Sequence, residues 1–170
     1  MKKKYELSDW KLRIDGHHLN RIRALRDFND VKVGDLGGFV SSEDNLSHDG
    51  DCWIYNDARV SGRARVFENA KIFGGDICSD ARVYGNAQVH GSSVYLCGNS
   101  NICGNARIYG RTDIDGSALI CGDAWIIGTE YIRVVGPVKL DRGVWTRMMK
   151  IGRGYYLISS TLERMSLGYG

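Results

Sequence analysis

Aliphatic residues recur at every sixth position through the middle of the chain, apart from one single-residue slip and one compensating insertion at residues 92–95. The series is Ile54, Val60, Val66 and Ile72, then Ile77, Val83 and Val89, then Leu96, Ile102, Ile108, Ile114, Ile120, Ile126 and Ile132. A small residue usually stands two positions before each, and Gly often stands two positions after, as in Ala106-Arg107-Ile108-Tyr109-Gly110. This pattern excludes an α-helix, whose apolar period is about 3.6 residues and in which each interior Gly costs about 1 kcal/mol.

The six-residue unit predicts a short strand followed by a corner. Side chains alternate across a strand, so the small and aliphatic residues point inward and the two residues beside the aliphatic one point outward. Glycine at the corner can adopt the positive φ of a tight turn. We therefore expect an all-β fold, a single-stranded triangular parallel β-helix over residues 33–137, with three hexads and about 18 residues in each coil.

Residues 1–32 are expected to form an N-terminal β cap on the first coil. Two strand-like segments, Tyr5–Ile14 and His18–Leu25, flank the turn signal Asp15-Gly16. Such a cap would protect the end of the solenoid from pairing with other chains.

Residues 138–170 are expected to form a C-terminal cap that begins just after Pro137, the only proline. Strand-like character surrounds Val144-Trp145 and Tyr155–Ile158. The run Ser160-Thr161-Leu162-Glu163 then matches a capping box, which predicts a short helix ending near Gly168.

The outward positions form stripes of aromatic and basic residues. On one face these candidate ligand- or partner-binding residues are Trp53, Tyr55, Lys71, Phe73, His90, Arg107, Tyr109 and Trp125, and on a second face they are Arg65, Phe67, Arg82 and Tyr84. Contiguous aromatic stripes are typical of an interface, which favours a homo-oligomer. Aromatic rings interleaved with Arg and Lys can also stack a base and pair a phosphate, which favours a nucleotide-like small ligand.

Composition and charge narrow the choice of partners. The 22 Gly stand beside a single Pro and 43% hydrophobic residues, which excludes a disordered Pro/Gly linker. The net charge of +3 is the sum of basic ends and an acidic middle. Because the surface is not uniformly basic, we do not expect a long nucleic acid as a partner. The sequence shows no signal peptide and no apolar run long enough to span a membrane, and we expect no membrane partner.

The five cysteines are an odd number in a chain that can build a core, which argues against a secreted disulfide framework and for a cytoplasmic protein. In the coil register Cys78 stacks over Cys97, and Cys103 stacks over Cys121. A zinc site needs a tetrahedral Cys/His set that these columns do not supply. Stacked neighbours about 4.8 Å apart could also form a bridge, but we expect isolated or interfacial thiols, no metal and no cofactor.

Several segments resemble a family of uncharacterised phage and prophage hexapeptide-repeat proteins. They are residues 19–28, Gly34-Asp35-Leu36-Gly37-Gly38-Phe39-Val40, Asn45-Leu46-Ser47, and the tandem hexads of the type Tyr84-Gly85-Asn86-Ala87. The resemblance covers about residues 5–137 and implies a phage origin and a β-helix. It carries no general activity that can be transferred to this chain.

The hexads are also similar to the left-handed β-helix of hexapeptide acyltransferases, which implies a left-handed coil. They depart from that family after the aliphatic residue, where this chain often places a large ring, such as Tyr84 or Tyr109. Acyl transfer on such a scaffold needs a general-base histidine. Only His90 lies among the clear hexads, so it is the candidate if the chain is an acyltransferase.

From the implied phage setting and the stripes we expect a non-enzymatic, oligomeric binding protein in the cytoplasm of an infected or lysogenic host. It would interfere with a host defence function by binding a host protein or a nucleotide-like ligand. The alternatives are an acyl-CoA-dependent acyltransferase and a purely structural or assembly protein.

Overall fold

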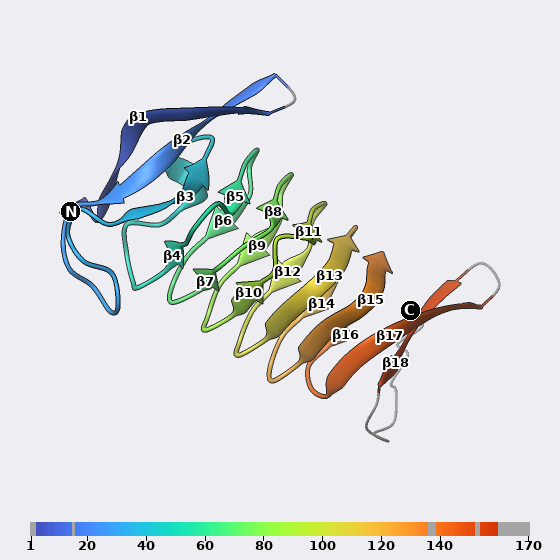
Figure 1. Cartoon of the computed structure of the whole chain (residues 1–170). Coiled ribbons are helices and arrows are strands. Elements are labelled where there is room, and N and C mark those ends of the chain that lie inside the picture. Colours follow the sequence, from blue (N-terminus) through green and yellow to red (C-terminus); the bar gives the residue numbers. More distant parts are fainter. Residues whose placement is uncertain (1–2, 15, 136–138, 152–153, 160–170) are drawn as a thin grey trace.

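A computed structural model of the chain describes residues 3–14, 16–135, 139–151 and 154–159 and shows an all-β solenoid (Figure 1). The one helical element in this described part is the 3₁₀ turn η1 (Glu43–Asn45). None of its helices is long and apolar enough to cross a membrane. The expected all-β, parallel, coiled architecture is confirmed.

The strands line up in three parallel ladders, which we call faces A, B and C. Face A contains β4 (Trp53–Ile54), β7 (Lys71–Ile72), β10 (Gln88–His90), the first parts of β13 (Arg107–Asp115) and β15 (Trp125–Val135), and the start of β17 (Val144–Ile151). Face B contains β6 (Arg65–Val66), β9 (Arg82–Val83), β12 (Asn101–Ile102), β14 (Leu119–Ile120) and β16 (Lys139–Leu140). Face C contains β3 (Leu36–Val40), β5 (Arg59–Val60), β8 (Asp76–Ile77), β11 (Val94–Leu96) and the second parts of β13 and β15.

The inward residues explain why the coils stack in one register. Each coil places an aliphatic residue directly over its equivalent in the next coil, as Ile54 pairs with Ile72 and Ile108 with Ile126. These residues and the preceding alanines are at most 1% exposed. Two inward residues on each short strand leave a narrow interior that larger side chains would overfill.

The register of the last predicted hexad is corrected by the structure. Ile132 lies opposite Thr112, while Val134 lies opposite Ile114 and is buried. The strand pairing shifts just after Gly110, so the aliphatic position moves two residues along the chain.

The parallel ladder also extends beyond the boundary that we placed at residue 137. Leu140 pairs with Ile120 on face B, and the start of β17 pairs with β15 on face A. Strand β17 also pairs antiparallel with β18 (Gly154–Ser159), so both segments with strand-like sequence form strands, whereas their pairing was not predicted. The helix predicted from Ser160 lies outside the described residues, and the left-handed sense of the coil stays a prediction.

The N-terminal segment caps the first coil as an antiparallel hairpin. Strands β1 (Tyr5–Ile14) and β2 (His17–Ala24) pair with each other, and β2 pairs with β3 (Figure 1). Tyr5 and Lys4 anchor the hairpin: the Tyr5 hydroxyl donates to the carbonyl oxygens of Glu43 and Leu46, and the buried Lys4 ammonium donates to the carbonyl oxygen and Sγ of Cys52.

Glycines and asparagines hold the corners. Ten glycines stand two positions after an aliphatic residue of the repeat, and eight of them have positive φ, whereas Gly74 and Gly128 do not. Asn69, Asn86, Asn105 and Asp123 form a side-chain hydrogen-bond ladder between faces B and A, with donor–acceptor distances of 3.0 to 3.2 Å. Each side chain of the ladder hydrogen-bonds to the equivalent side chain in the next coil, which supports the common register of the coils.

Replacing Gly110 by Ala should destabilise the protein more than replacing Gly34 by Ala. Both glycines have positive φ, but a Cβ at Gly34 would meet no atom within 4 Å, whereas a Cβ at Gly110 would overlap the Gly128 carbonyl oxygen. The unfavourable φ costs roughly 1–2 kcal/mol in each variant, and overpacking adds about 1–3 kcal/mol in Gly110→Ala. Urea unfolding measures both, and equal losses would contradict the steric account.

Candidate functional site

Face A carries a column of stacked rings from four successive coils. The Tyr55–Phe73 and Phe73–His90 ring centroids are 4.4 Å apart, and those of His90 and Tyr109 are 4.6 Å apart, with interplanar angles of 12 to 14°. We call these four residues the ring column. The sequence predicted that they would share a face, and the parallel strand pairing brings them into direct contact.

The flat faces of the inner rings in the ring column are covered by neighbouring rings of the same column. Each inner ring is covered on both sides at van der Waals contact, so a nucleotide base cannot insert between the rings without separating them. The stack ends at Tyr109, because Trp125 lies 6.5 Å from it and is tilted by 51°. The Arg107 guanidinium lies 4.9 Å from the Trp125 ring centroid, so this end is occupied by a cation–π contact.

The N-terminal segment covers the first part of face A. Trp53 points outward from its coil, yet it is only 1% exposed, because Tyr5 and Phe28 pack edge-on against its ring. The expectation that Trp53 lies on an exposed binding surface is therefore wrong. The outward direction of a side chain does not reveal what another segment places over it.

Asp30 ties two further face A residues to the N-terminal segment. Its carboxylate accepts hydrogen bonds from the Lys71 ammonium at 2.7 Å and from the Tyr55 hydroxyl at 2.9 Å. The bond from Lys71 lowers the pKa of Asp30, and burial followed by the bond to Asp30 raises the pKa of Tyr55. Lys71 is thus already paired with a carboxylate.

His90 sits between Phe73 and Tyr109 and is half-buried. Burial, and then the positive charge of Arg107, lower the pKa of its imidazole. Its Nε2 lies 3.3 Å from the Gln88 side-chain oxygen. The stacked rings cover the two flat faces of the imidazole, and the ring nitrogens at its edge remain the atoms that could transfer a proton.

A groove of about 300 Å³ opens beside the ring column, at the corner between faces A and C. It is lined by Asn56, Asp57, Ala58, Arg59, Phe73, Gly74, Gly75, Asp76, Gly91 and Ser92. Gly91 and Ser92 directly follow His90 in the chain, so the groove adjoins the histidine.

Unequal corner lengths explain the groove. At this corner Ile54 and Val60 are six positions apart and Ile72 and Ile77 only five, whereas the next coil inserts a residue. The short coil turns through Gly74 and Gly75, so it recedes between two longer neighbours. The slip and the insertion seen in the sequence were the signal for this groove, although no site was predicted there.

Arg59 is the polar group that distinguishes the groove. Its guanidinium makes one long contact, 3.4 Å from Nη1 to the Asp76 carboxylate, and its buried Nε has no hydrogen-bond acceptor among the described residues. The other acidic lining residue, Asp57, lies 3.5 Å from Arg21. The groove is thus lined by a guanidinium with an incomplete set of hydrogen bonds, that of Arg59, and by two carboxylates that can accept hydrogen bonds, those of Asp57 and Asp76.

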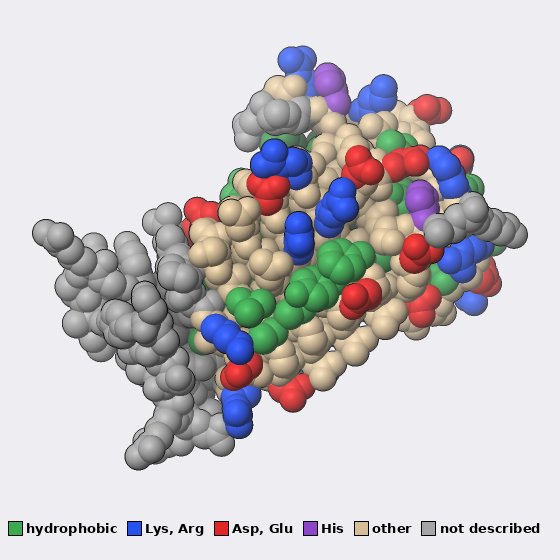
Figure 2. Space-filling view, turned by 180° about the vertical axis from the view of Figure 1, so that it is seen from behind, with side chains coloured by type: hydrophobic (Ala, Val, Ile, Leu, Met, Phe, Trp, Pro, Cys, Tyr) green, Lys and Arg blue, Asp and Glu red, His purple; other side chains and the backbone are tan. Residues whose placement is uncertain are grey.

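Face B carries a shorter aromatic stack that continues as cysteines. Figure 2 shows a line of hydrophobic side chains along this side of the molecule. The Phe67 and Tyr84 rings are 4.8 Å apart and nearly parallel, and Cys103 and Cys121 follow in the next coils. The remaining face B candidates, Arg65 and Arg82, are exposed.

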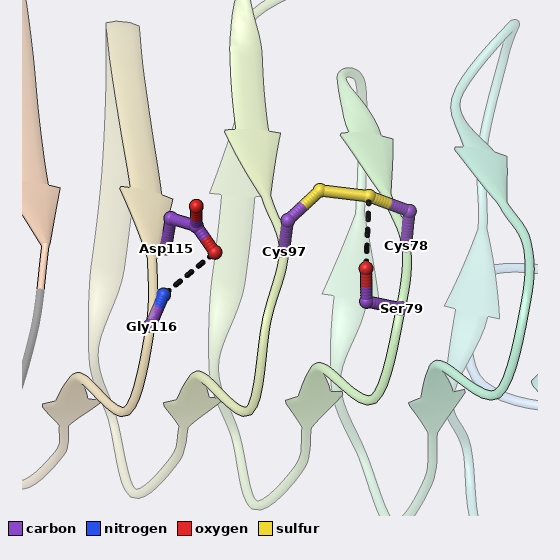
Figure 3. Close-up of a disulfide and its surroundings, with 5 residues drawn as sticks. All are labelled: Cys78, Ser79, Cys97, Asp115 and Gly116. Carbon is purple, nitrogen blue, oxygen red and sulfur yellow. Dashed lines mark hydrogen bonds between the residues drawn. A yellow bond between two sulfur atoms is a disulfide. The ribbon is translucent and has the colours of Figure 1, made fainter.

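Cys78 and Cys97 form a disulfide between neighbouring coils (Figure 3). The expectation of free thiols is wrong for this pair. Parallel pairing of Ile77 with Leu96 brings the following residues together, with Cα atoms 4.9 Å apart, within the range that a disulfide spans. The cysteine count therefore no longer argues for a reducing compartment. In the described part of the chain, no group of three or more His, Cys, Asp or Glu side chains is placed to hold a metal ion.

No protein-family model matches the chain. It is 40% identical over 55 residues to a protein of Escherichia coli (strain K12) named uncharacterized acetyltransferase YdcK. The match covers 28% of this chain and 17% of that relative, so the chain spans under a fifth of the relative's length. The similarity supports the acyltransferase-like part of the resemblance and does not bear on a phage origin.

Replacing His90 by Phe should remove one source of acid sensitivity. As the pH falls below about 6.5, the unfolded chain takes up a proton at His90 that the folded protein resists, so wild-type stability declines until the lowered folded pKa is reached. His90→Phe keeps a ring in the column but lacks this proton. Its stability relative to wild type, from urea unfolding at pH 7.5 and 5.5, should rise at the lower pH.

His48, whose pKa is also lowered, is present in both proteins and cancels in that comparison. A difference between the proteins that stays constant with pH would contradict the assignment to His90.

Proposed function

We propose that the chain is a ligand-binding β-solenoid whose small-molecule site is the groove between faces A and C. The observation that carries the proposal is the incompletely satisfied Arg59 guanidinium. A carboxylate or phosphate in the groove would accept a charge-assisted hydrogen bond from this guanidinium, because the Arg59 side chain is 38% exposed and its contact with Asp76 is long. Asp76 would accept a hydrogen bond from a hydroxyl or amino group of the same ligand.

The size and lining of the groove define the ligand class. Its volume lies at the lower limit of known ligand sites, about 300 Å³, so it fits a small anion with hydroxyl or amino groups, or that portion of a larger molecule. A ribose phosphate has this chemistry, which keeps a nucleotide-like ligand within the proposal. The base would then contact the outward ring edges rather than stack inside the ring column.

Replacing Arg59 by Gln should weaken binding of such a ligand. We would use calorimetry with a panel of linear and cyclic nucleotides, and expect a loss of roughly 10-fold to 100-fold, because a hydrogen bond to a charged group is worth about 1.5–3 kcal/mol. Arg111→Gln is the matched control, since Arg111 is exposed at the same corner but outside the groove.

Two results would count against this ligand site. One is equal affinity for the Arg59 and Arg111 variants. The other is the absence of heat with every nucleotide, together with a mass spectrum showing that no small molecule copurifies with the folded protein.

Oligomerisation and the cellular role form the wider part of the proposal. The hydrophobic line on face B and the ring edges on face A are suited to contact with a second copy or with a host protein. Interference with a host defence function rests on the resemblance of residues 19–47 to phage proteins. Light scattering would give the oligomeric state, and pull-downs from host lysate would test the protein partner.

Acyl-CoA-dependent acyl transfer is the second candidate, favoured by the similarity to the acetyltransferase-named relative. His90 would act as the general base: neutral imidazole accepts the proton of an acceptor hydroxyl or amine, whose oxygen or nitrogen then attacks the thioester carbonyl. The C–S bond of the thioester breaks, and the departing CoA thiolate takes the proton from the imidazolium. The groove beside it would hold the acceptor.

In this case His90→Phe should lower an acetyl-CoA-dependent activity by about 10² to 10⁴, the usual contribution of a positioned general base. Because Phe preserves the ring column, circular dichroism should show an intact fold. Arg111→Gln is again the control. A wild-type activity that survives His90→Phe would exclude this mechanism.

A further inference from the structure

Cys103 and Cys121 occupy equivalent positions in neighbouring coils. Ile102 pairs with Ile120 in the parallel ladder of face B, and each cysteine is the next residue after one of these. Cys78 and Cys97 stand in the same relation to Ile77 and Leu96 on face C. The molecule therefore contains the same cross-coil cysteine geometry twice, bonded in one case and free in the other.

The free pair is partly exposed. Both side chains are half-buried rather than enclosed, unlike Cys52, which is fully buried. Burial and then the neighbouring Cys103 raise the pKa of Cys121, and a hydrogen bond with Cys103 raises the pKa of Tyr84 to about 12. The strand register thus places Cys103 between Tyr84 and Cys121 in successive coils.

We propose that Cys103 and Cys121 are a thiol–disulfide exchange site that closes a second cross-coil disulfide. Adjacent parallel strands are about 4.8 Å apart, which is within the Cα separation that a disulfide bridges. The oxidant is a low-molecular-weight disulfide such as glutathione disulfide. One cysteine thiolate attacks a sulfur of this disulfide and releases one thiol, and the second cysteine then attacks the mixed disulfide and releases the other.

The step is balanced: two cysteine thiols lose two electrons and two protons, and one small disulfide gains them to become two thiols. The new bond would share a coil with the existing one, because Cys97 and Cys103 directly follow two consecutive strands, β11 and β12. The two bonds together would link three consecutive coils. In a solenoid each coil contacts only its neighbours, so such links oppose local fraying between faces B and C.

The test is exposure of the folded, full-length protein to glutathione disulfide, followed by denaturation, alkylation of free thiols and mass mapping. We expect a linked Cys103–Cys121 peptide pair, lighter by about 2 Da than the two reduced peptides, and Cys52 recovered in its alkylated form because its buried thiol does not react in the folded protein. Dithiothreitol should reverse the new bond, and the oxidised form should unfold at a higher temperature.

Cys121→Ser is the matched variant, in which Cys103 should instead retain a stable glutathione adduct. A second variant, Cys78→Ser/Cys97→Ser, removes reshuffling with the existing bond and should still form the Cys103–Cys121 link. The proposal is overturned if wild-type Cys103 and Cys121 remain alkylatable, or carry two separate glutathione adducts, under conditions that convert Cys103 in the Cys121→Ser variant.

Discussion

The stacking of each coil on the next, at the spacing of a parallel sheet, is the constraint on which the rest of this structure depends. Strands about 4.8 Å apart bring equivalent outward side chains into contact along the whole solenoid. The ring centroids of Phe73 and His90, 4.4 Å apart, and the Cα atoms of Cys78 and Cys97, 4.9 Å apart, follow that spacing. The narrow core of small and aliphatic residues enforces it, because a one-residue change of register would turn the outward side chains inward.

Much of this could be predicted from the sequence, because the constraint is periodic. A six-residue repeat of inward residues fixes which outward residues become neighbours. The sequence therefore predicted which residues belong to the ring column and to the two cysteine columns. The contacts between the N-terminal cap and the coils could not be predicted. Trp53 is buried by Phe28 and Tyr5, and Asp30 captures Lys71, through a cap whose packing on the coil has no period.

The departures from periodicity carry the candidate site. In a perfectly regular column the side chains bind one another: the rings cover each other's faces and the asparagines hydrogen-bond to one another. Few ring faces or hydrogen-bonding groups then remain free to bind a ligand. The short turn through Gly74 and Gly75 breaks this regularity and leaves Arg59 without a full set of acceptors. The sequence showed the slip, but the hollow also depended on the longer turns on either side.

The similarity to an acetyltransferase-named protein has to be weighed against the same constraint. Fifty-five residues is the length of about three coils of a hexad solenoid, and packing alone requires small residues, aliphatic residues and corner glycines in any such stretch. Shared packing residues indicate a shared coil, whereas chemistry depends on outward groups. For this chain the outward groups that can decide between binding and acyl transfer are Arg59 in the groove and His90 beside it. The choice therefore depends on an incompletely satisfied guanidinium and on an imidazole whose pKa burial lowers, rather than on the repeat.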